Sequence, residues 1–105
     1  MIDRLPLPIE LPYEALADFC RRWKITKMEV FGSVLRDDFG PESDVDFLVA
    51  YEAPPSLFGL ADAEEELANI VGRPVDIVSR KAIEASHNWV RRRLILDSAK
   101  TIYVA

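Results

Sequence analysis

GSVLR at residues 32–36 and SDVDFLV at residues 43–49 are the two segments that decide the fold of this chain. The Gly-Ser pair ends one apolar run, and ten residues after it Asp44 and Asp46 open the next. In a strand these two side chains project from the same side, roughly 6.6 Å apart. At an effective dielectric constant near 20, two such charges repel by about 2–3 kcal/mol. Carboxylate oxygens beside substrate phosphates suit Mg²⁺, so the pattern predicts a metal–nucleotide site.

The Gly32-Ser33 pair is the candidate phosphate contact. A strand–turn–helix with Ser at the helix start presents backbone N–H groups and a hydroxyl to an anion. Glycine lets a phosphate approach the backbone closely. Taken alone, the pair would indicate no more than a serine cap after a glycine turn, and only the downstream aspartates favour the phosphate site.

A third carboxylate, Asp76, lies between Val75 and Ile77 in another apolar run. Asp46 likewise lies inside an apolar strand, and an unpaired carboxylate there costs several kcal/mol, which favours a cation as the partner of Asp46. The structural alternatives are that Asp44 is a turn residue and that Asp76 accepts from a neighbouring backbone N–H.

Composition predicts a single domain over residues 1–105, in which prolines make residues 1–12 an extended arm. Half of the residues are hydrophobic and 30% are charged, as in an ordinary soluble domain. The net charge of −5 argues against direct nucleic-acid binding, which usually leaves a basic footprint. There is no membrane-length apolar stretch or signal peptide, and Cys20 is the single cysteine, so we expect a cytoplasmic protein.

Hydrophobic periodicity predicts an α/β (α+β) domain in which helices and strands alternate. Residues 44–51 are apolar on both faces, which is typical of a central strand. The segment 81–86 is ambiguous and could form one turn. We expect helices over 13–23, 33–38, 60–71 and 88–99, and strands over 27–31, 44–51, 73–79 and 101–105.

The spacing G-S-x10-D-x-D, with Asp76 downstream, resembles the DNA polymerase β-like nucleotidyltransferase superfamily. The likeness is greatest to its minimal members, the nucleotidyltransferase antitoxins that pair with helical HEPN toxins, and it extends over residues 11–103. The resemblance implies the polymerase β-like fold, a short mixed sheet with helices packed mainly on one face.

The resemblance also implies the roles of the site residues. Asp44, Asp46 and Asp76 would hold two Mg²⁺ ions, and Asp76 would assist the attacking hydroxyl. Gly32 and Ser33 would hold the phosphates of ATP. Arg36 would lie near the nucleotide, although a structural salt bridge explains an arginine at that position equally well.

The activity that the resemblance implies is protein adenylylation. The antitoxin would transfer AMP from ATP to a tyrosine of its HEPN ribonuclease toxin, neutralise it, and form a hetero-oligomer with it. Larger relatives carry a second domain for their acceptor, so we expect another protein to supply the acceptor here. One alternative is a binding module that inhibits the toxin by occlusion, and another is a transferase acting on a small molecule or an RNA end.

Three consecutive arginines, residues 91–93, follow Trp89 and could suggest RNA contact. Consecutive helical residues point in different directions, which favours a solvated face or a surface that meets an acidic partner. His87 has no second histidine or cysteine near it in sequence and is expected to be a surface or capping residue.

Overall fold

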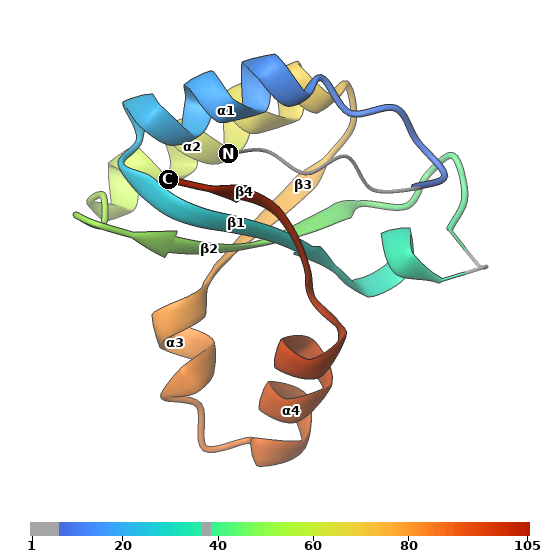
Figure 1. Ribbon diagram of the computed structural model, residues 1–105, viewed down its shortest axis with the longest axis vertical. Helices are drawn as coiled ribbons and strands as arrows, with labels where there is room; N and C mark the ends of the chain where they lie inside the picture. The colour runs from blue at the N-terminus through green and yellow to red at the C-terminus, as the bar shows by residue number, and fades with distance from the viewer. Residues whose placement is uncertain (1–6, 37–38) are drawn as a thin grey trace.

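The computed structural model describes residues 7–36 and 39–105. In it, helices and strands alternate through most of the chain (Figure 1). Their bounds are α1 Tyr13–Arg22, β1 Ile25–Phe31, the 3₁₀ helix η1 Gly32–Leu35, β2 Val45–Tyr51, α2 Leu57–Val71, β3 Val75–Ser79, α3 Arg80–Glu84, α4 Trp89–Ser98 and β4 Lys100–Val104.

The four strands form one mixed sheet in the order β3-β2-β1-β4. β1 pairs antiparallel with both β2 and β4, whereas β2 and β3 are parallel. Parallel neighbours need a crossover connection, and α2 provides it between β2 and β3. The predicted central position of the strand after Asp44 is therefore confirmed, with β2 inside the sheet.

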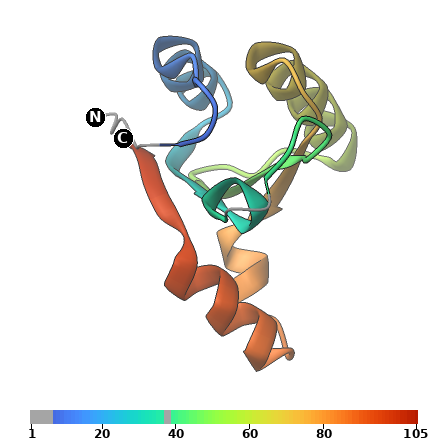
Figure 2. The ribbon, with the colours of Figure 1, turned by 90° about the vertical axis from the view of Figure 1, so that its right-hand side faces the viewer.

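Helices α1 and α2 cover one face of the sheet, and the larger hydrophobic core lies beneath them (Figure 2). The predicted apolar face of α1 is confirmed, because Leu16, Phe19 and Cys20 are fully buried. Burial raises the pKa of the Cys20 thiol to about 12. This core also contains Met28, Val30, Val34, Val45, Phe47, Val49, Leu67 and Ile102.

The opposite face of the sheet carries α3 and α4, which form a layer of their own (Figure 1). A smaller buried cluster fills the space beneath them and contains Phe31, Leu48, Ile83 and Ile95. The expectation that helices pack mainly on one face is confirmed for α1 and α2, which cover the larger core. The second layer packs on the face of β2 that carries Leu48 and, two residues before it, Asp46.

Local capping fixes where the helices begin and end. The Ser56 hydroxyl accepts from the Gly59 N–H at 3.1 Å at the start of α2, and Gly72 ends that helix at a φ of +83°. The Asn88 side chain accepts from the Arg91 N–H at 3.1 Å and begins α4, as the sequence predicts. Such caps satisfy backbone groups that the helix leaves unpaired.

Some expectations at element boundaries are corrected. The short helix expected over 33–38 is a 3₁₀ helix over Gly32–Leu35, and residues 37–38 lie outside the described part. The ambiguous segment 81–86 begins one residue earlier as helix α3. Residues 7–12 of the expected arm form no helix or strand, and residues 1–6 are outside the described ranges. Among the described helices, none has the length and apolar character needed to cross a bilayer.

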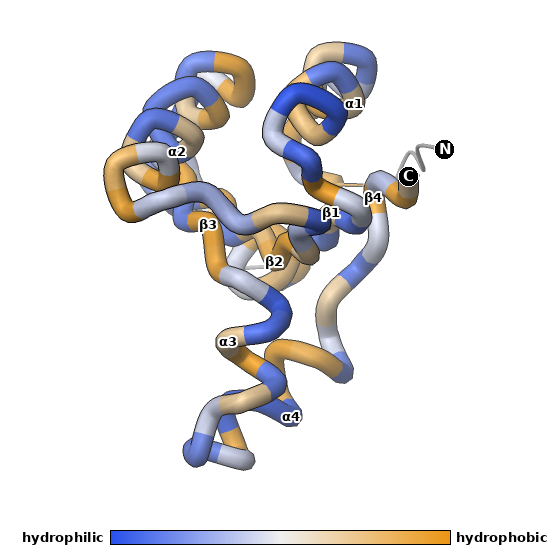
Figure 3. Tube along the Cα trace, turned by 90° about the vertical axis from the view of Figure 1, so that its left-hand side faces the viewer, coloured by the Kyte–Doolittle hydropathy of each residue, from blue (hydrophilic) through white to orange (hydrophobic). Residues whose placement is uncertain are grey.

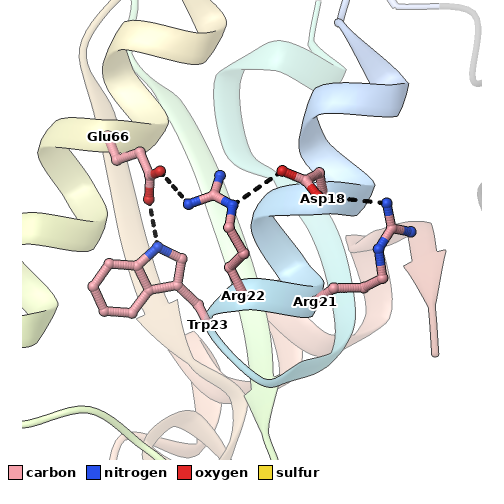
Figure 4. A network of polar contacts seen from close by, with 5 residues as sticks. All are labelled: Asp18, Arg21, Arg22, Trp23 and Glu66. Atoms are coloured by element: carbon pink, nitrogen blue, oxygen red, sulfur yellow. Dashed lines mark hydrogen bonds and ion pairs between the residues drawn. The ribbon is translucent and has the colours of Figure 1, made fainter.

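A network of polar contacts joins α1 to α2 on the outer side of the larger core (Figure 4). Glu66 of α2 accepts from the Trp23 indole N–H at 2.5 Å and pairs with Arg22, which also bonds to Asp18 at 3.0 Å. The Trp23 hydrogen bond, and more weakly Arg22, lower the pKa of Glu66 against the effect of its partial burial.

This network makes stability depend on pH in a definite direction. Because the folded-state pKa of Glu66 is lowered, its contribution is complete above the usual glutamate pKa and is lost as pH falls through the folded value. We expect the difference in unfolding free energy between the wild type and Glu66→Gln, measured by urea denaturation, to shrink on acidification from neutral pH. Glu65→Gln, at an exposed neighbour on α2, serves as the control, and a pH-independent difference for Glu66→Gln would contradict the assignment.

Candidate active site

Two of the predicted carboxylates are direct neighbours across the parallel strands. Asp46 of β2 stands in register with Asp76 of β3. Side chains in register on adjacent strands lie on the same face of a sheet. Leu48, two residues after Asp46, packs in the cluster beneath α3 and α4, so the carboxylate pair faces the α4 layer.

The environment of Asp46 disfavours its charged form. Asp46 is half-buried, and burial is the main cause that raises its pKa. The negative charges of Asp76 and then Asp44 raise it further, while Arg36 acts in the opposite direction. The charges of Asp44, Asp76 and Arg36, which come from three separate segments of the chain, therefore all act on Asp46.

Gly32 lies next to this site, and its lack of a side chain leaves room for Asp46. Its φ is +77°, a conformation that L side chains rarely adopt. A Cβ placed there would lie 2.3 Å from Asp46 Oδ2. Two reasons therefore favour glycine in the turn after β1. Its backbone has a positive φ, and a Cβ would lie too close to the Asp46 carboxylate.

A cavity of about 350 Å³ opens over the carboxylate pair. A second cavity of about 430 Å³ shares Gly32, Arg36, Leu94 and Ser98 with the first, and Lys100 joins its lining. The two form one cleft between the sheet and α4. The first cavity is lined by Phe31, Gly32, Arg36, Asp46, Asp76, Arg91, Leu94, Ile95 and Ser98.

Ser33 and Asp44 stand beside this cleft and are not among the residues that line it. The Ser33 hydroxyl donates to the backbone oxygen of Asp44 at 3.3 Å. This bond ties η1 to the residue immediately before β2. Asp44 itself is exposed, one position before the strand begins.

Arg73 supports the loop that carries Asp44. Its guanidinium donates to the backbone oxygens of Gly40 at 3.3 Å and Ser43 at 3.0 Å, and lies 4.7 Å from the ring centroid of Phe39. Sequence reasoning missed this role, because nothing in the order of residues pairs position 73 with positions 40 and 43.

The two carboxylates are chemically suited to bind a hard cation. Asp46 and Asp76 present oxygen ligands side by side, the type that Mg²⁺ prefers. Within residues 7–36 and 39–105, no three His, Cys, Asp or Glu side chains are close enough to form a ready-made metal-binding group. The assignment of Asp44, Asp46 and Asp76 as metal ligands therefore stays a proposal.

The structure places two basic residues at the cleft that the sequence did not assign to it. Arg91 and Lys100 line the cleft, whereas Arg92 donates to the Glu84 backbone oxygen and Arg93 pairs with Asp97. The three arginines do point in different directions, but Arg91 lines the same cavity as Asp46 and Asp76. The available signal was the spacing of Arg91 with Leu94, Ile95 and Ser98, because i, i+3, i+4 and i+7 share a helix face.

Comparison with known proteins places the chain in a family. Residues 13–102 match the model of the nucleotidyltransferase domain. The chain belongs to the nucleotidyltransferase domain family. A Methanocaldococcus jannaschii protein described as a candidate protein adenylyltransferase is 32% identical over 77 residues, which is 72% of this chain and 76% of the relative. The protein adenylyltransferase MntA of Thermococcus cleftensis is 36% identical over 64 residues, 61% of this chain and 65% of MntA.

Solved structures give the same assignment for this nucleotidyltransferase. A structure described as a candidate minimal nucleotidyltransferase superposes with a TM-score of 0.65 at 33% identity, covering 84% of this chain and 86% of that one. The Shewanella oneidensis complex of a tri-AMPylated HEPN toxin with its MNT antitoxin matches with a TM-score of 0.62 at 15% identity, covering 89% and 70%. The expected polymerase β-like fold is confirmed.

Glycine substitutions separate backbone strain from the clash with Asp46. Gly72→Ala meets only the strain of a positive φ, about 1–2 kcal/mol, so nucleotidyl transfer should persist. Gly32→Ala adds the contact with Asp46 Oδ2, and we expect greater destabilisation together with loss of transfer. Gly40→Ala, with open space around its Cβ, is the neutral control. Thermal unfolding and nucleotidyl transfer, measured side by side, test this order, and equal behaviour of Gly32→Ala and Gly72→Ala would contradict it.

Proposed function

We propose that this nucleotidyltransferase is an antitoxin that transfers AMP from ATP to a tyrosine of a HEPN ribonuclease toxin and thereby neutralises it. The observation that carries the proposal is the in-register pair Asp46 and Asp76, facing a cleft that also holds Arg36, Arg91 and Gly32. Carboxylates for a cation and guanidinium groups for phosphates stand in one cleft, as transfer of a nucleotide requires.

The chemistry is an in-line displacement at the α-phosphorus of ATP. The tyrosine oxygen forms a bond to that phosphorus, the bond to the bridging oxygen of the β-phosphate breaks, and pyrophosphate leaves. Asp76 accepts the hydroxyl proton. Arg36 and Arg91 offset negative charge on the phosphates, and Gly32 lets the nucleotide approach the backbone beside Ser33. Positioning and charge neutralisation carry such a reaction.

Asp44, Asp46 and Asp76 are the residues that would hold Mg²⁺, with two ions expected. When bound, Mg²⁺ neutralises phosphate charge and lowers the pKa of the attacking hydroxyl. The raised pKa of Asp46 beside two other aspartates is consistent with a place for positive charge.

The names of relatives support the choice of acceptor. The Thermococcus relative is a protein adenylyltransferase, and the Shewanella complex contains an AMPylated HEPN toxin bound to an MNT antitoxin. Another structure of this fold is a toxin–antitoxin with AMP-PNP, an ATP analogue. We carry the protein acceptor and ATP to this chain as part of the proposal, together with a cytoplasmic site of action, which the free, buried thiol of Cys20 suits.

Intact-protein mass spectrometry tests the transfer. The probe is a HEPN protein encoded beside this chain, incubated with the chain, ATP and Mg²⁺. We expect the mass of one or more AMP groups to be added, and a rate at least about 100-fold lower for Asp46→Asn or Asp76→Asn, because the charge that organises the site is removed. Asp62→Asn, at an exposed acid on α2, should transfer normally.

The outcomes separate the candidate functions. Tight binding without an added mass, and neutralisation that survives Asp46→Asn, would overturn the enzymatic account and leave inhibition by occlusion. Modification of an RNA end or a small molecule in place of the HEPN protein would overturn the protein acceptor alone.

A further inference from the structure

The layer beneath the sheet differs in charge from the rest of the molecule. We define the basic lobe as residues 80–100, which include α3, α4 and the start of β4. It contains six Lys or Arg and two Asp or Glu residues, a net charge of +4, in a chain whose net charge is −5. The layer that faces the carboxylate pair therefore carries a net positive charge within an acidic chain.

The same layer exposes large apolar side chains on α4. Trp89 is 62% exposed, Val90 49% and Leu94 66%. They line a groove of about 380 Å³ along the outer side of the helix, together with Arg93, Asp97 and Ser98. Figure 3 shows hydrophobic segments within α4, in the layer that projects away from the sheet. Such side chains gathered at one groove are typical of a contact surface rather than of scattered exposure.

This groove is continuous with the catalytic cleft. Leu94 and Ser98 line both the groove and the cavity over Asp46 and Asp76. One side of α4 thus faces the reacting groups, and the adjoining side is apolar and open. A segment seated in the groove would stand next to the cleft in which AMP is transferred.

From this continuity, and resting on the proposed function, we propose that the α4 groove is the docking surface for the protein acceptor. The occupant is a segment with an apolar face bordered by carboxylates. Its apolar side chains cover Trp89, Val90 and Leu94, and its carboxylates meet the positive charge of the basic lobe. Docking there brings a neighbouring hydroxyl of the acceptor to Asp76.

Charge complementarity favours an acidic protein segment over a second copy of this chain or a nucleic acid. The net charge of +4 on the basic lobe attracts the carboxylates of an acidic segment. A second copy would bring its own basic lobe against this one, and like charges in contact are unfavourable. The apolar groove is not the polar, wet surface that nucleic acids usually meet.

The test uses the double variant Trp89→Ser/Val90→Ser, which leaves every residue of the catalytic cleft in place. The matched control is Leu57→Ser/Phe58→Ser. Leu57 and Phe58 are 86% and 87% exposed, and they line neither the groove nor the cleft. Circular dichroism verifies folding of both. The probe is the HEPN protein encoded beside this chain, with binding measured by interferometry without ATP.

We expect the groove variant to bind the probe at least about tenfold more weakly, to require more acceptor for half-maximal AMP transfer, and to keep its maximal rate. Wild-type binding should weaken as salt rises, and binding of Mg-ATP alone should be unchanged. The control variant should match the wild type throughout.

Other results overturn the docking proposal. These are unchanged affinity of the groove variant, absence of any binding by the wild type, and self-association of the wild type that the groove variant abolishes. Binding of single-stranded RNA that depends on Trp89 and Val90 overturns it as well. If the groove variant loses binding but the wild type transfers no AMP, the docking surface stands and the proposed enzymatic function fails.

Discussion

The parallel pairing of β2 with β3 is the constraint on which the site depends. It places Asp46 beside Asp76, two carboxylates that thirty positions separate in sequence. An antiparallel arrangement would need only a short hairpin, whereas the parallel one requires the α2 crossover. Burial of apolar side chains in the larger core beneath α1 and α2 stabilises this crossover helix. The hydrophobic core on one face of the sheet thus stabilises a fold that brings two negative charges together on the opposite face.

The backbone around Asp46 and Asp76 is held by contacts that leave room for these carboxylates and position them. Gly32 leaves room for the Asp46 carboxylate, which would have to shift if residue 32 carried a Cβ, and Ser33 bonds to the backbone of Asp44. Arg73 holds the loop from the β3 side by its bonds to two carbonyl groups. These contacts bring the ends of β1, β2 and β3 together around one point. They position the carboxylates, and α4 closes the cleft from below with Arg91 and Lys100 nearby.

The helix α4 links catalysis to recognition in our proposals. Its inner side completes the cleft, and its outer side is apolar within a basic lobe. A small domain has few surfaces near its active site, and here one helix contributes to two of them. Occlusion and adenylylation would use the same docking surface, so the chemistry at Asp46 and Asp76 is what distinguishes them.

The sequence by itself determined the order of helices and strands, the apolar face of α1, the end of α2 at Gly72, and the family to which the G-S-x10-D-x-D pattern belongs. These features are local, since periodicity and capping are set within a few residues and the motif lies within residues 32–46. Only the tertiary structure decided that Asp46 and Asp76 are in register, that Gly32 contacts Asp46, and that Arg73 supports the loop before β2. It also brought Arg91 and Lys100 into the cleft, and it left Asp44 and Ser33 beside the cavity instead of in its lining. Contacts of this kind join residues far apart in the chain, and they are set by strand register and the packing of α4, which no local pattern encodes.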